Sequence, residues 1–324
     1  MRAAVLGGGL MGSGIAQVFA SAGFATRIYE PDTRVRQSLS GRIEESLVAN
    51  GRDVRALDLI DATGDLGEAL ADAAFVIESA PEKLDLKRGL FAQAVDLTTP
   101  DVILATNTSV IPVTRIAAGL PTAERIIGAH WWNPAPLIPL VEVVQGERTS
   151  PETVERTMAM MRRLGKTPAH VKRDVPGFIG NRLQFALWRE AIAMIAEGVC
   201  DAATLDMCVK SGFGRRLAVL GPLENADLIG LDLTLDIHRI IIPELDRHAA
   251  PHEHLRAKVG EGKLGFKTGE GFQRWTEEDM RQVRSRLVDH LLSFQSADVS
   301  ADARPTSGND GESPKPSLPI PRSR

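Results

Sequence analysis

Residues 2–30, RAAVLGGGLMGSGIAQVFASAGFATRIYE, decide the fold because they join an apolar strand, a glycine turn, a helix and a second strand. Gly7, Gly9 and Gly12 form G-x-G-x-x-G directly after the first apolar run. The first glycine permits a tight turn, the second lets a pyrophosphate approach the backbone, and the third allows close helix–strand packing. The helix that follows directs its N-terminal amides at the phosphates. The stretch predicts a dinucleotide site; the alternative is a glycine-rich turn without a ligand.

The second strand of this unit ends in an acid that bears on the choice of cofactor. Glu30 follows Gly12 by eighteen residues, a spacing that lets a carboxylate accept hydrogen bonds from the adenosine ribose. The same carboxylate would repel a 2′-phosphate, so we expect NAD in preference to NADP. Arg34 lies four residues further on and would weaken that preference. Leu10 and Met11, inside the glycine motif, are expected beside the cofactor.

Short apolar runs continue along the first half of the chain. They occupy residues 74–80, 102–109, 125–131 and 140–144, and helical segments separate the earlier ones. This alternation predicts a right-handed, doubly wound sheet in which all of these runs are parallel strands. Ligands of such sheets bind at the carboxyl ends of the strands. The side chains that end the second and third of these runs should therefore face one crevice.

The second half of the chain has a different pattern. After a helix near 151–164 and a strand at 167–173, Pro176 and Gly177 interrupt the chain, and a long helix then runs to about Glu197. Further helical segments follow without intervening strands. This region is therefore predicted to be all-α.

We expect an α/β domain at residues 1–173, built on a doubly wound parallel sheet, followed by an all-α substrate and dimerisation domain at 174–295. Residues 296–324 are rich in Ser, Pro, Gly and Asp and nearly free of large apolar side chains. Such a segment cannot bury enough surface to offset the entropy of ordering, so it is predicted to be a disordered tail. The alternative is a proline-rich ligand role for residues 314–321, PKPSLPIP.

Composition excludes several classes of function. A net charge of −4 with 25% charged residues gives no support for a nucleic-acid or membrane-surface partner. No apolar run approaches the ~20 residues that span a bilayer, and no signal peptide precedes the first strand, so we expect a cytoplasmic protein. Cys200 and Cys208 are the two cysteines of the chain, and neither a disulfide framework nor a metal site is expected from them.

Residues 129–144, AHWWNPAPLIPLVEVV, contain an acid inside an apolar strand. An ionised carboxylate there is strongly disfavoured without a partner, so Glu142 needs one, and His130 is the candidate. In such a pair the acid fixes the imidazole tautomer and leaves the other ring nitrogen for proton transfer. A structural histidine is the alternative. Trp131 and Trp132 are interpreted as packing residues.

Eight motifs in order along roughly residues 1–295 resemble those of the 3-hydroxyacyl-CoA dehydrogenase family. They are GGGLMGSGIAQ, APEKLDLKRGLF, ATNTS, AHWWNPAP, PLVEVV, DVPGFIGNRL, GPLENADLIGLD and GFKTGEGF. The resemblance implies a Rossmann domain and an α-helical domain that forms a homodimer. It also implies NAD-dependent oxidation, by hydride transfer, of a secondary alcohol β to a carbonyl in a small molecule.

The resemblance also implies roles for individual residues. His130 matches the catalytic histidine, and Glu142 matches the acid that pairs with it. Ser109 and Asn181 match the polar pair that completes the catalytic set and binds the substrate oxygen. The positions that contact the nicotinamide half of the cofactor are Glu82, Lys87 and Asn133, together with Ser109.

One departure from the family pattern concerns the segment after the second strand. Acyl-CoA members have a long, basic helical hairpin there, which helps to hold the nucleotide end of CoA. Residues 41–47, GRIEESL, keep its start, so Ser46 matches a CoA-contacting serine. The continuation at 48–65 is shorter and carries Arg52 and Arg55 among a larger number of aspartates. A polyphosphate would find little positive charge there.

A second departure is SGFGRRLAVLGPLE at 211–224, which is more similar to lambda-crystallin and to related dehydrogenases of small carboxylated substrates. Arg216 in this segment would hold a carboxylate in bidentate fashion; a solvated surface arginine is the alternative. We therefore expect a free 3-hydroxy acid such as L-gulonate, L-carnitine or an aromatic carboxylate. Ser46 keeps a CoA thioester open. The rival class is a non-catalytic crystallin-like or NAD(H)-binding protein.

Overall fold

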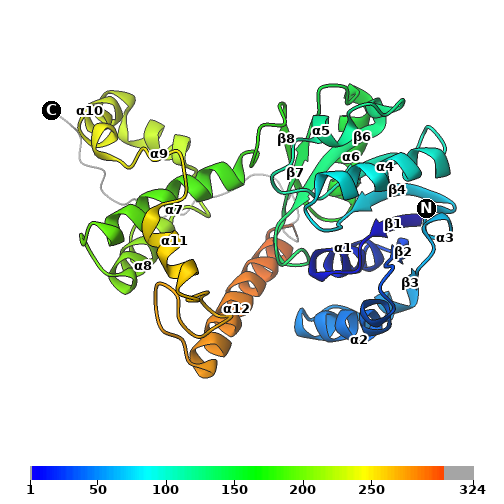
Figure 1. Cartoon of the computed structure of the whole chain (residues 1–324), viewed down its shortest axis with the longest axis horizontal. Coiled ribbons are helices and arrows are strands. Elements are labelled where there is room, and N and C mark those ends of the chain that lie inside the picture. Colours follow the sequence, from blue (N-terminus) through cyan, green and yellow to red (C-terminus); the bar gives the residue numbers. More distant parts are fainter. Residues whose placement is uncertain (1, 303–324) are drawn as a thin grey trace, which may run out of the picture.

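The computed structural model describes residues 2–302 of the 324-residue chain, and side chains as far as residue 294. Its first half is an eight-stranded sheet in the order β3-β2-β1-β4-β5-β6-β7-β8. Figure 1 shows this sheet on one side of the molecule and a helical region on the other. The strands are β1 (Arg2–Leu6), β2 (Ala25–Tyr29), β3 (Ile60–Thr63), β4 (Ala73–Glu78), β5 (Ile103–Thr106), β6 (Ile126–Trp131), β7 (Leu140–Val144) and β8 (Thr167–Val171).

Helices cover both faces of the sheet, because each face of a buried parallel sheet is apolar. One face carries α1 (Leu10–Ser21), α2 (Thr33–Ala49) and α6 (Pro151–Arg163), with the short helix η1 (Val54–Leu59). The other carries α3 (Leu66–Leu70), α4 (Leu84–Leu97) and α5 (Val113–Ala117). The predicted α/β class, with a doubly wound sheet followed by helices, is confirmed.

The direction of β7 was predicted wrongly. It runs antiparallel to β6, and β8 then runs parallel to β7. The connection at 132–139 is too short for the helical crossover that a parallel neighbour requires, so the chain turns back as a hairpin. The antiparallel register sets His130 directly opposite Glu142.

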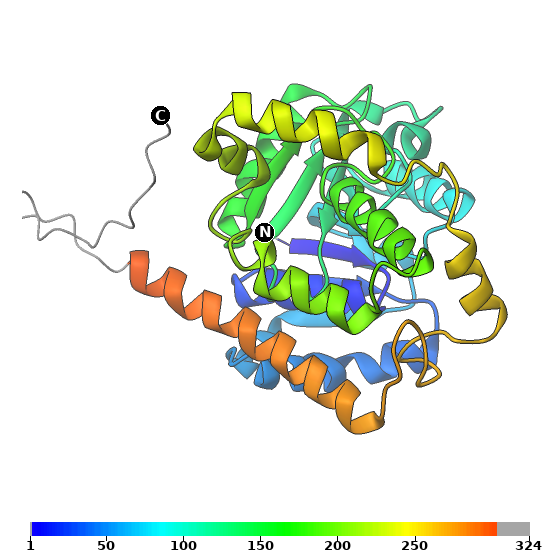
Figure 2. The same cartoon turned by 90° about the vertical axis from the view of Figure 1, so that its left-hand side faces the viewer.

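The second half is helical, as predicted, and Figure 2 shows it in front of the sheet. Its last helix runs through residue 302, beyond the predicted start of the tail at 296, and the rest of the predicted tail, 303–324, lies outside the described residues. No described helix is long and apolar enough to cross a bilayer. The helices are α7 (Gly180–Ala196), α8 (Ala202–Ser211), η3 (Phe213–Arg215), α9 (Pro222–Ile229), α10 (Leu231–Ile241), η4 (Ile242–Glu244), α11 (Glu253–Gly260) and α12 (Glu277–Asp302).

Candidate active site

The centre of the site is a buried histidine–carboxylate pair. Nδ1 of His130 lies 2.7 Å from Oε2 of Glu142, and both side chains are buried. The pairing follows from the hairpin, because directly opposed residues of adjacent antiparallel strands point to the same face of the sheet. The rings of Trp132 and Phe178 lie 5.4 Å and 5.6 Å from the imidazole, centroid to centroid. The predicted partner of Glu142 is thus the observed one.

The second oxygen of Glu142 binds the start of the long helix α7. Oε1 accepts hydrogen bonds from the amides of Ile179 and Gly180 at 2.9 Å and 3.0 Å. Burial by itself raises the pKa of Glu142, but the hydrogen bonds from His130 and from these two amides outweigh it, so the pKa falls below its ordinary value. Glu142 therefore stays ionised, and it connects the sheet to the helical region.

The polar pair expected to bind the substrate oxygen also comes together. Asn181, in the first turn of α7, donates from Nδ2 to the carbonyl oxygen of Ser109 at 3.3 Å. Ser109 is half-buried in the loop that leaves β5. The four predicted catalytic residues are therefore linked, because Asn181 follows directly on the amides that bind Glu142.

Glu82 shapes the loop that carries Ser109. Its Oε1 accepts hydrogen bonds from the amides of Ser109 and Val110, each at 3.1 Å, and from the hydroxyl of Thr108. Burial raises the pKa of Glu82, but the Thr108 hydroxyl, the nearby Lys87 and the Val110 amide together bring it below its ordinary value. The sequence suggested a cofactor contact for Glu82 and did not suggest this positioning role.

Lys87 lies deeper than its predicted role requires. Its side chain is 1% exposed, and Nζ lies 2.8 Å and 2.9 Å from the two carboxylate oxygens of Glu78 and 3.3 Å from Glu82. Glu78 also accepts from the hydroxyl of Thr106 at 2.6 Å. The ammonium group is thus held by Glu78 at the carboxyl end of β4, by Glu82 between β4 and α4, and by the carbonyl oxygen of Ala80 at 3.3 Å. Its predicted contact with nicotinamide stays a prediction.

The glycine turn fits the pyrophosphate of a dinucleotide. A Cβ on Gly7, which has φ +114°, would lie 2.7 Å from the carbonyl oxygen of Ser79, and one on Gly12 would lie 1.8 Å from that of Gly7. A Cβ on Gly9 would meet nothing within 4 Å. Glycine is therefore needed at positions 7 and 12 because the backbone packs too closely there for a side chain. Gly9 leaves open space at the start of α1 for a phosphate to approach.

The remaining residues predicted to bind the cofactor surround this turn. Leu10 is 70% exposed at the first position of α1, whereas Met11 is partly buried and packs on the core. Glu30 accepts from the amides of Gly8 at 2.8 Å and Asp32 at 3.0 Å. Its carboxylate is thereby fixed beside the turn, where the ribose was predicted to bind.

Ser46 and Asn133, predicted on different grounds, line one small cavity of about 170 Å³ together with Leu10. The Ser46 hydroxyl donates to Oε1 of Gln17 at 2.7 Å and accepts from Nδ2 of Asn50 at 3.2 Å. In this arrangement the serine completes a contact between α1 and α2. Its predicted role in substrate binding stays a prediction.

Arg216 is the predicted substrate residue that does not join the others. It is exposed at the end of η3, between α8 and α9, and Figure 1 shows both helices well away from β6 and β7. Within the described single chain it therefore lies apart from β6, which carries His130, and it does not line the cavity that Asn181 lines. The described residues also contain no cluster of metal ligands.

Gly180 is a site residue that the sequence analysis missed. Its amide binds Glu142, and a Cβ at this position would lie 2.4 Å from Cζ2 of Trp132. Glycine lets the start of α7 pack against Trp132, whose ring lies beside that of His130. The glycine directly before Asn181 in GFIGN was the available signal.

Family models match both halves of the chain. The NAD-binding domain of 3-hydroxyacyl-CoA dehydrogenase matches residues 2–175, and the C-terminal domain of the same enzyme matches residues 177–275. The chain belongs to the 3-hydroxyacyl-CoA dehydrogenase family. It is therefore an NAD-dependent dehydrogenase that acts on a CH–OH group, as the sequence predicted.

Three relatives show the range of the family around this chain. The 5-formyl-3-hydroxy-2-methylpyridine 4-carboxylate 5-dehydrogenase of Mesorhizobium japonicum is 34% identical over 90% of this chain and 96% of its own length. A 3-hydroxybutyryl-CoA dehydrogenase of Bradyrhizobium diazoefficiens is 37% identical over 84% and 94% of the two chains. Lambda-crystallin of Oryctolagus cuniculus is 36% identical over 69% and 73%.

A solved structure agrees with the first of these relatives. The crystal structure of a dehydrogenase of that pyridine carboxylic acid, called an NAD+-dependent dismutase, superposes with a TM-score of 0.83 at 33% identity. The match covers 91% of this chain and 97% of that one. The family's fold therefore extends over nearly all of the described chain.

Proposed function

We propose that this protein oxidises the 3-hydroxyl group of a short 3-hydroxy acid to the 3-oxo acid, and that a free acid is a better substrate than its CoA thioester. The observation that carries the proposal is the buried His130–Glu142 pair, linked through the start of α7 to Asn181 and Ser109. A proton acceptor and polar groups for one substrate oxygen thus lie together at the carboxyl ends of the strands.

The roles of the residues follow from their contacts. Glu142 accepts the Nδ1 proton of His130, so Nε2 carries the lone pair that takes the proton of the substrate hydroxyl. NAD, when bound, would accept the hydride from the substrate carbon that carries this hydroxyl. The imidazolium that forms is stabilised by the ionised Glu142, and Ser109 and Asn181 hold the oxygen as it becomes a carbonyl. In the reverse direction His130 returns the proton to that oxygen.

Local charge supports the preference for a free acid. The segment after α2 carries several aspartates, and Arg55 within it is ion-paired with Asp53 at 2.6 Å. This leaves little positive charge for the phosphates of CoA. The names of relatives span both substrate classes, since one is a pyridine 4-carboxylate dehydrogenase and another a 3-hydroxybutyryl-CoA dehydrogenase.

The test is to compare NAD reduction by 3-hydroxybutyryl-CoA with that by a panel of free 3-hydroxy acids that includes L-gulonate, L-carnitine and aromatic carboxylates. We expect the higher kcat/KM with one of the free acids. Turnover of the thioester alone would reject the free-acid preference and keep the dehydrogenase. Binding of NADH without turnover of any substrate would favour the non-catalytic alternative.

We also propose that the protein is a two-fold dimer. Leu231, Leu235 and Ile240 of α10 are 63%, 52% and 71% exposed in the single chain. Apolar exposure on this scale is typical of an interface.

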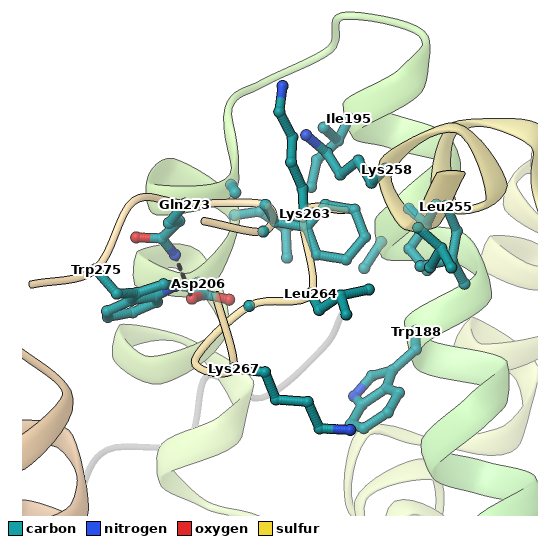
Figure 3. Close-up of a pocket in the computed structure, with 18 residues that line it drawn as sticks. Trp188, Ile195, Asp206, Leu255, Lys258, Lys263, Leu264, Lys267, Gln273 and Trp275 are labelled. Carbon is teal, nitrogen blue, oxygen red and sulfur yellow. Dashed lines mark hydrogen bonds between the residues drawn. The ribbon is translucent and has the colours of Figure 1, made fainter. Parts of the chain in front are cut away.

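The same chain offers a complementary surface, a cavity of about 590 Å³ in the helical region. Figure 3 shows Trp188 of α7, Leu255 of α11 and Leu264 around it. Two copies related by a two-fold axis would each bring an apolar helix to the apolar surface of the other. The mass in solution at micromolar concentration is the test, and a monomeric mass would reject the dimer.

A further inference from the structure

We propose that Arg182 of α7, and not Arg216, binds the carboxylate of the substrate. The inference rests on the proposed function, because it requires a free acid as substrate. Its starting point is a cavity of about 600 Å³ that begins at Asn181 and Val110, beside the Ser109 loop. Asn181, one of the two residues that are to hold the reacting oxygen, lines this cavity, so a substrate bound at Asn181 would extend into it.

The charged side chains that line this cavity are all positive. They are Arg182 and Arg189, with no acid among the lining residues. Nε of Arg189 already lies 3.4 Å from the carboxylate of Asp246. The guanidinium group of Arg182 makes no hydrogen bond or ion pair with the side chains described, up to residue 294, so its donors are available to a ligand. An arginine fork in that state suits a carboxylate, which it can bind with two parallel hydrogen bonds.

Position along the helix also favours Arg182. It follows Asn181 directly in the first turn of α7, whereas Arg189 lies about 12 Å further along the axis from Asn181, at 1.5 Å per residue. In a 3-hydroxy acid the hydroxyl carbon and the carboxylate are separated by one carbon. A substrate with its hydroxyl at Ser109 and Asn181 therefore reaches Arg182 first. Phe185, 55% exposed one turn later, supplies an apolar wall for the carbon skeleton.

The experiment compares a free 3-hydroxy acid that the wild type oxidises with its methyl ester. We expect Arg182→Met to raise KM for the acid about ten- to a hundredfold, since charge-assisted bidentate contacts have that strength, and to change KM for the ester less than about twofold. Arg182→Lys keeps the positive charge but cannot form two parallel hydrogen bonds, so its KM for the acid should lie between those of the wild type and Arg182→Met. The matched control is Arg256→Met, because Arg256 is an exposed arginine of α11 outside the cavity. Equal changes for acid and ester, or an unchanged KM for the acid, would overturn the proposal.

A binding measurement separates this inference from the proposed function. Acetoacetate and methyl acetoacetate can be titrated into the enzyme–NADH complex and followed by NADH fluorescence, which needs no turnover. We expect Arg182→Met to weaken acetoacetate binding by the same factor and to leave the ester unaffected. If acetoacetate and its ester bind the wild type equally, no carboxylate site exists at Arg182, whatever the enzyme oxidises. A wild type that binds acetoacetate through Arg182 but oxidises no 3-hydroxy acid would reject the proposed function alone.

Discussion

The two halves of the chain differ in how they bury their apolar side chains. The sheet half has a core on each face, centred on residues such as Phe19 and Ile43 on one side and Phe91 and Ile116 on the other. In the helical half Ala193 of α7 is buried, while α8, α9, α10 and α11 contain no buried residue. The sheet half therefore has a core of its own, whereas α8, α9, α10 and α11 leave large apolar side chains exposed in the single chain.

The predicted catalytic residues follow the same division. His130, Glu142 and Ser109 belong to the sheet half, and the helical half contributes the first turn of α7 with Asn181. Glu142 connects the halves because one oxygen binds His130 and the other binds the amides at the start of α7. We therefore expect changes on the sheet side to affect chemistry, changes on the helical side to affect association, and changes at the junction to affect both.

The largest effect is expected for His130→Ala. It removes the proton acceptor and leaves the glycine turn intact, so kcat should fall about 10⁴-fold while NADH affinity stays the same. Steady-state kinetics and NADH fluorescence titration measure the two quantities. A rate near that of the wild type would reject the mechanism.

Glu142→Gln should have the next largest effect. The amide keeps the shape but not the charge that stabilises the imidazolium, so we expect a loss of about 10²–10³-fold in kcat. Stability should fall as well, because the amides of Ile179 and Gly180 lose an ionised acceptor. A variant that loses rate and keeps its melting temperature would show that Glu142 does not couple the two halves.

The stability effect of Glu142 should depend on pH. Because its pKa is lowered in the folded protein, the carboxylate stabilises the fold above the ordinary pKa of 4.5, and that contribution is lost as pH falls through the lowered value. The gap in melting temperature between the wild type and Glu142→Gln should therefore narrow below pH 4.5. A constant gap down to pH 3 would contradict the assignment.

Ile240→Glu tests the dependence of the helical half on a partner. Ile240 is 71% exposed in the single chain, so a charge there is harmless to a monomer but disfavoured in an apolar interface. We expect the dimer dissociation constant to rise about a hundredfold, measured by sedimentation at several concentrations. The matched control is Leu97→Glu, because Leu97 is 49% exposed on α4 of the sheet half. If the two substitutions raised the dimer dissociation constant equally, the helical half would not be the one that forms the interface.

Gly180→Ala tests the junction from the helical side. The added Cβ would lie 2.4 Å from Trp132, so the start of α7 must move and its amide must shift away from Glu142. Overpacking of this kind lowers the free energy of unfolding by about 1–3 kcal/mol. Urea denaturation measures it. Gly89→Ala in α4 is the control, since its Cβ meets nothing within 4 Å and it should stabilise the protein slightly.

Features that a short stretch of sequence determines were predictable. The glycine turn, the alternation of the main apolar strands with helices and the need of Glu142 for a partner all follow from neighbouring residues. The direction of β7 was predicted wrongly. The connection at 132–139 is too short for a parallel neighbour of β6, and the prediction took no account of its length. β3 was not predicted, because this short edge strand has exposed side chains at Asp61 and Ala62 and no apolar run that would indicate a strand.

Several contacts between distant segments were not predictable. The hydrogen bonds that the Ser109 loop donates to Glu82, and the burial of Lys87 between two acids, depend on how β4, β5 and α4 meet. Arg216 was chosen from its neighbours in sequence, whereas Arg182 stands beside the site because the first turn of α7 docks on Glu142. Sequence spacing alone gives no measure of that docking.

The smallest effect is expected at the edge of the sheet half, for Glu30→Ala. The Glu30 carboxylate is held by the amides of Gly8 and Asp32, so its charge faces the expected place of the adenosine ribose. Its removal should leave the fold intact. The ratio of kcat/KM for NAD to kcat/KM for NADP should fall about tenfold, which corresponds to the free energy of one charge–charge interaction. The effect should act through NADP, whose 2′-phosphate is no longer repelled, while Arg34 remains exposed nearby to attract it. Equal use of both cofactors by the unaltered enzyme would show that Arg34 already cancels the charge of Glu30.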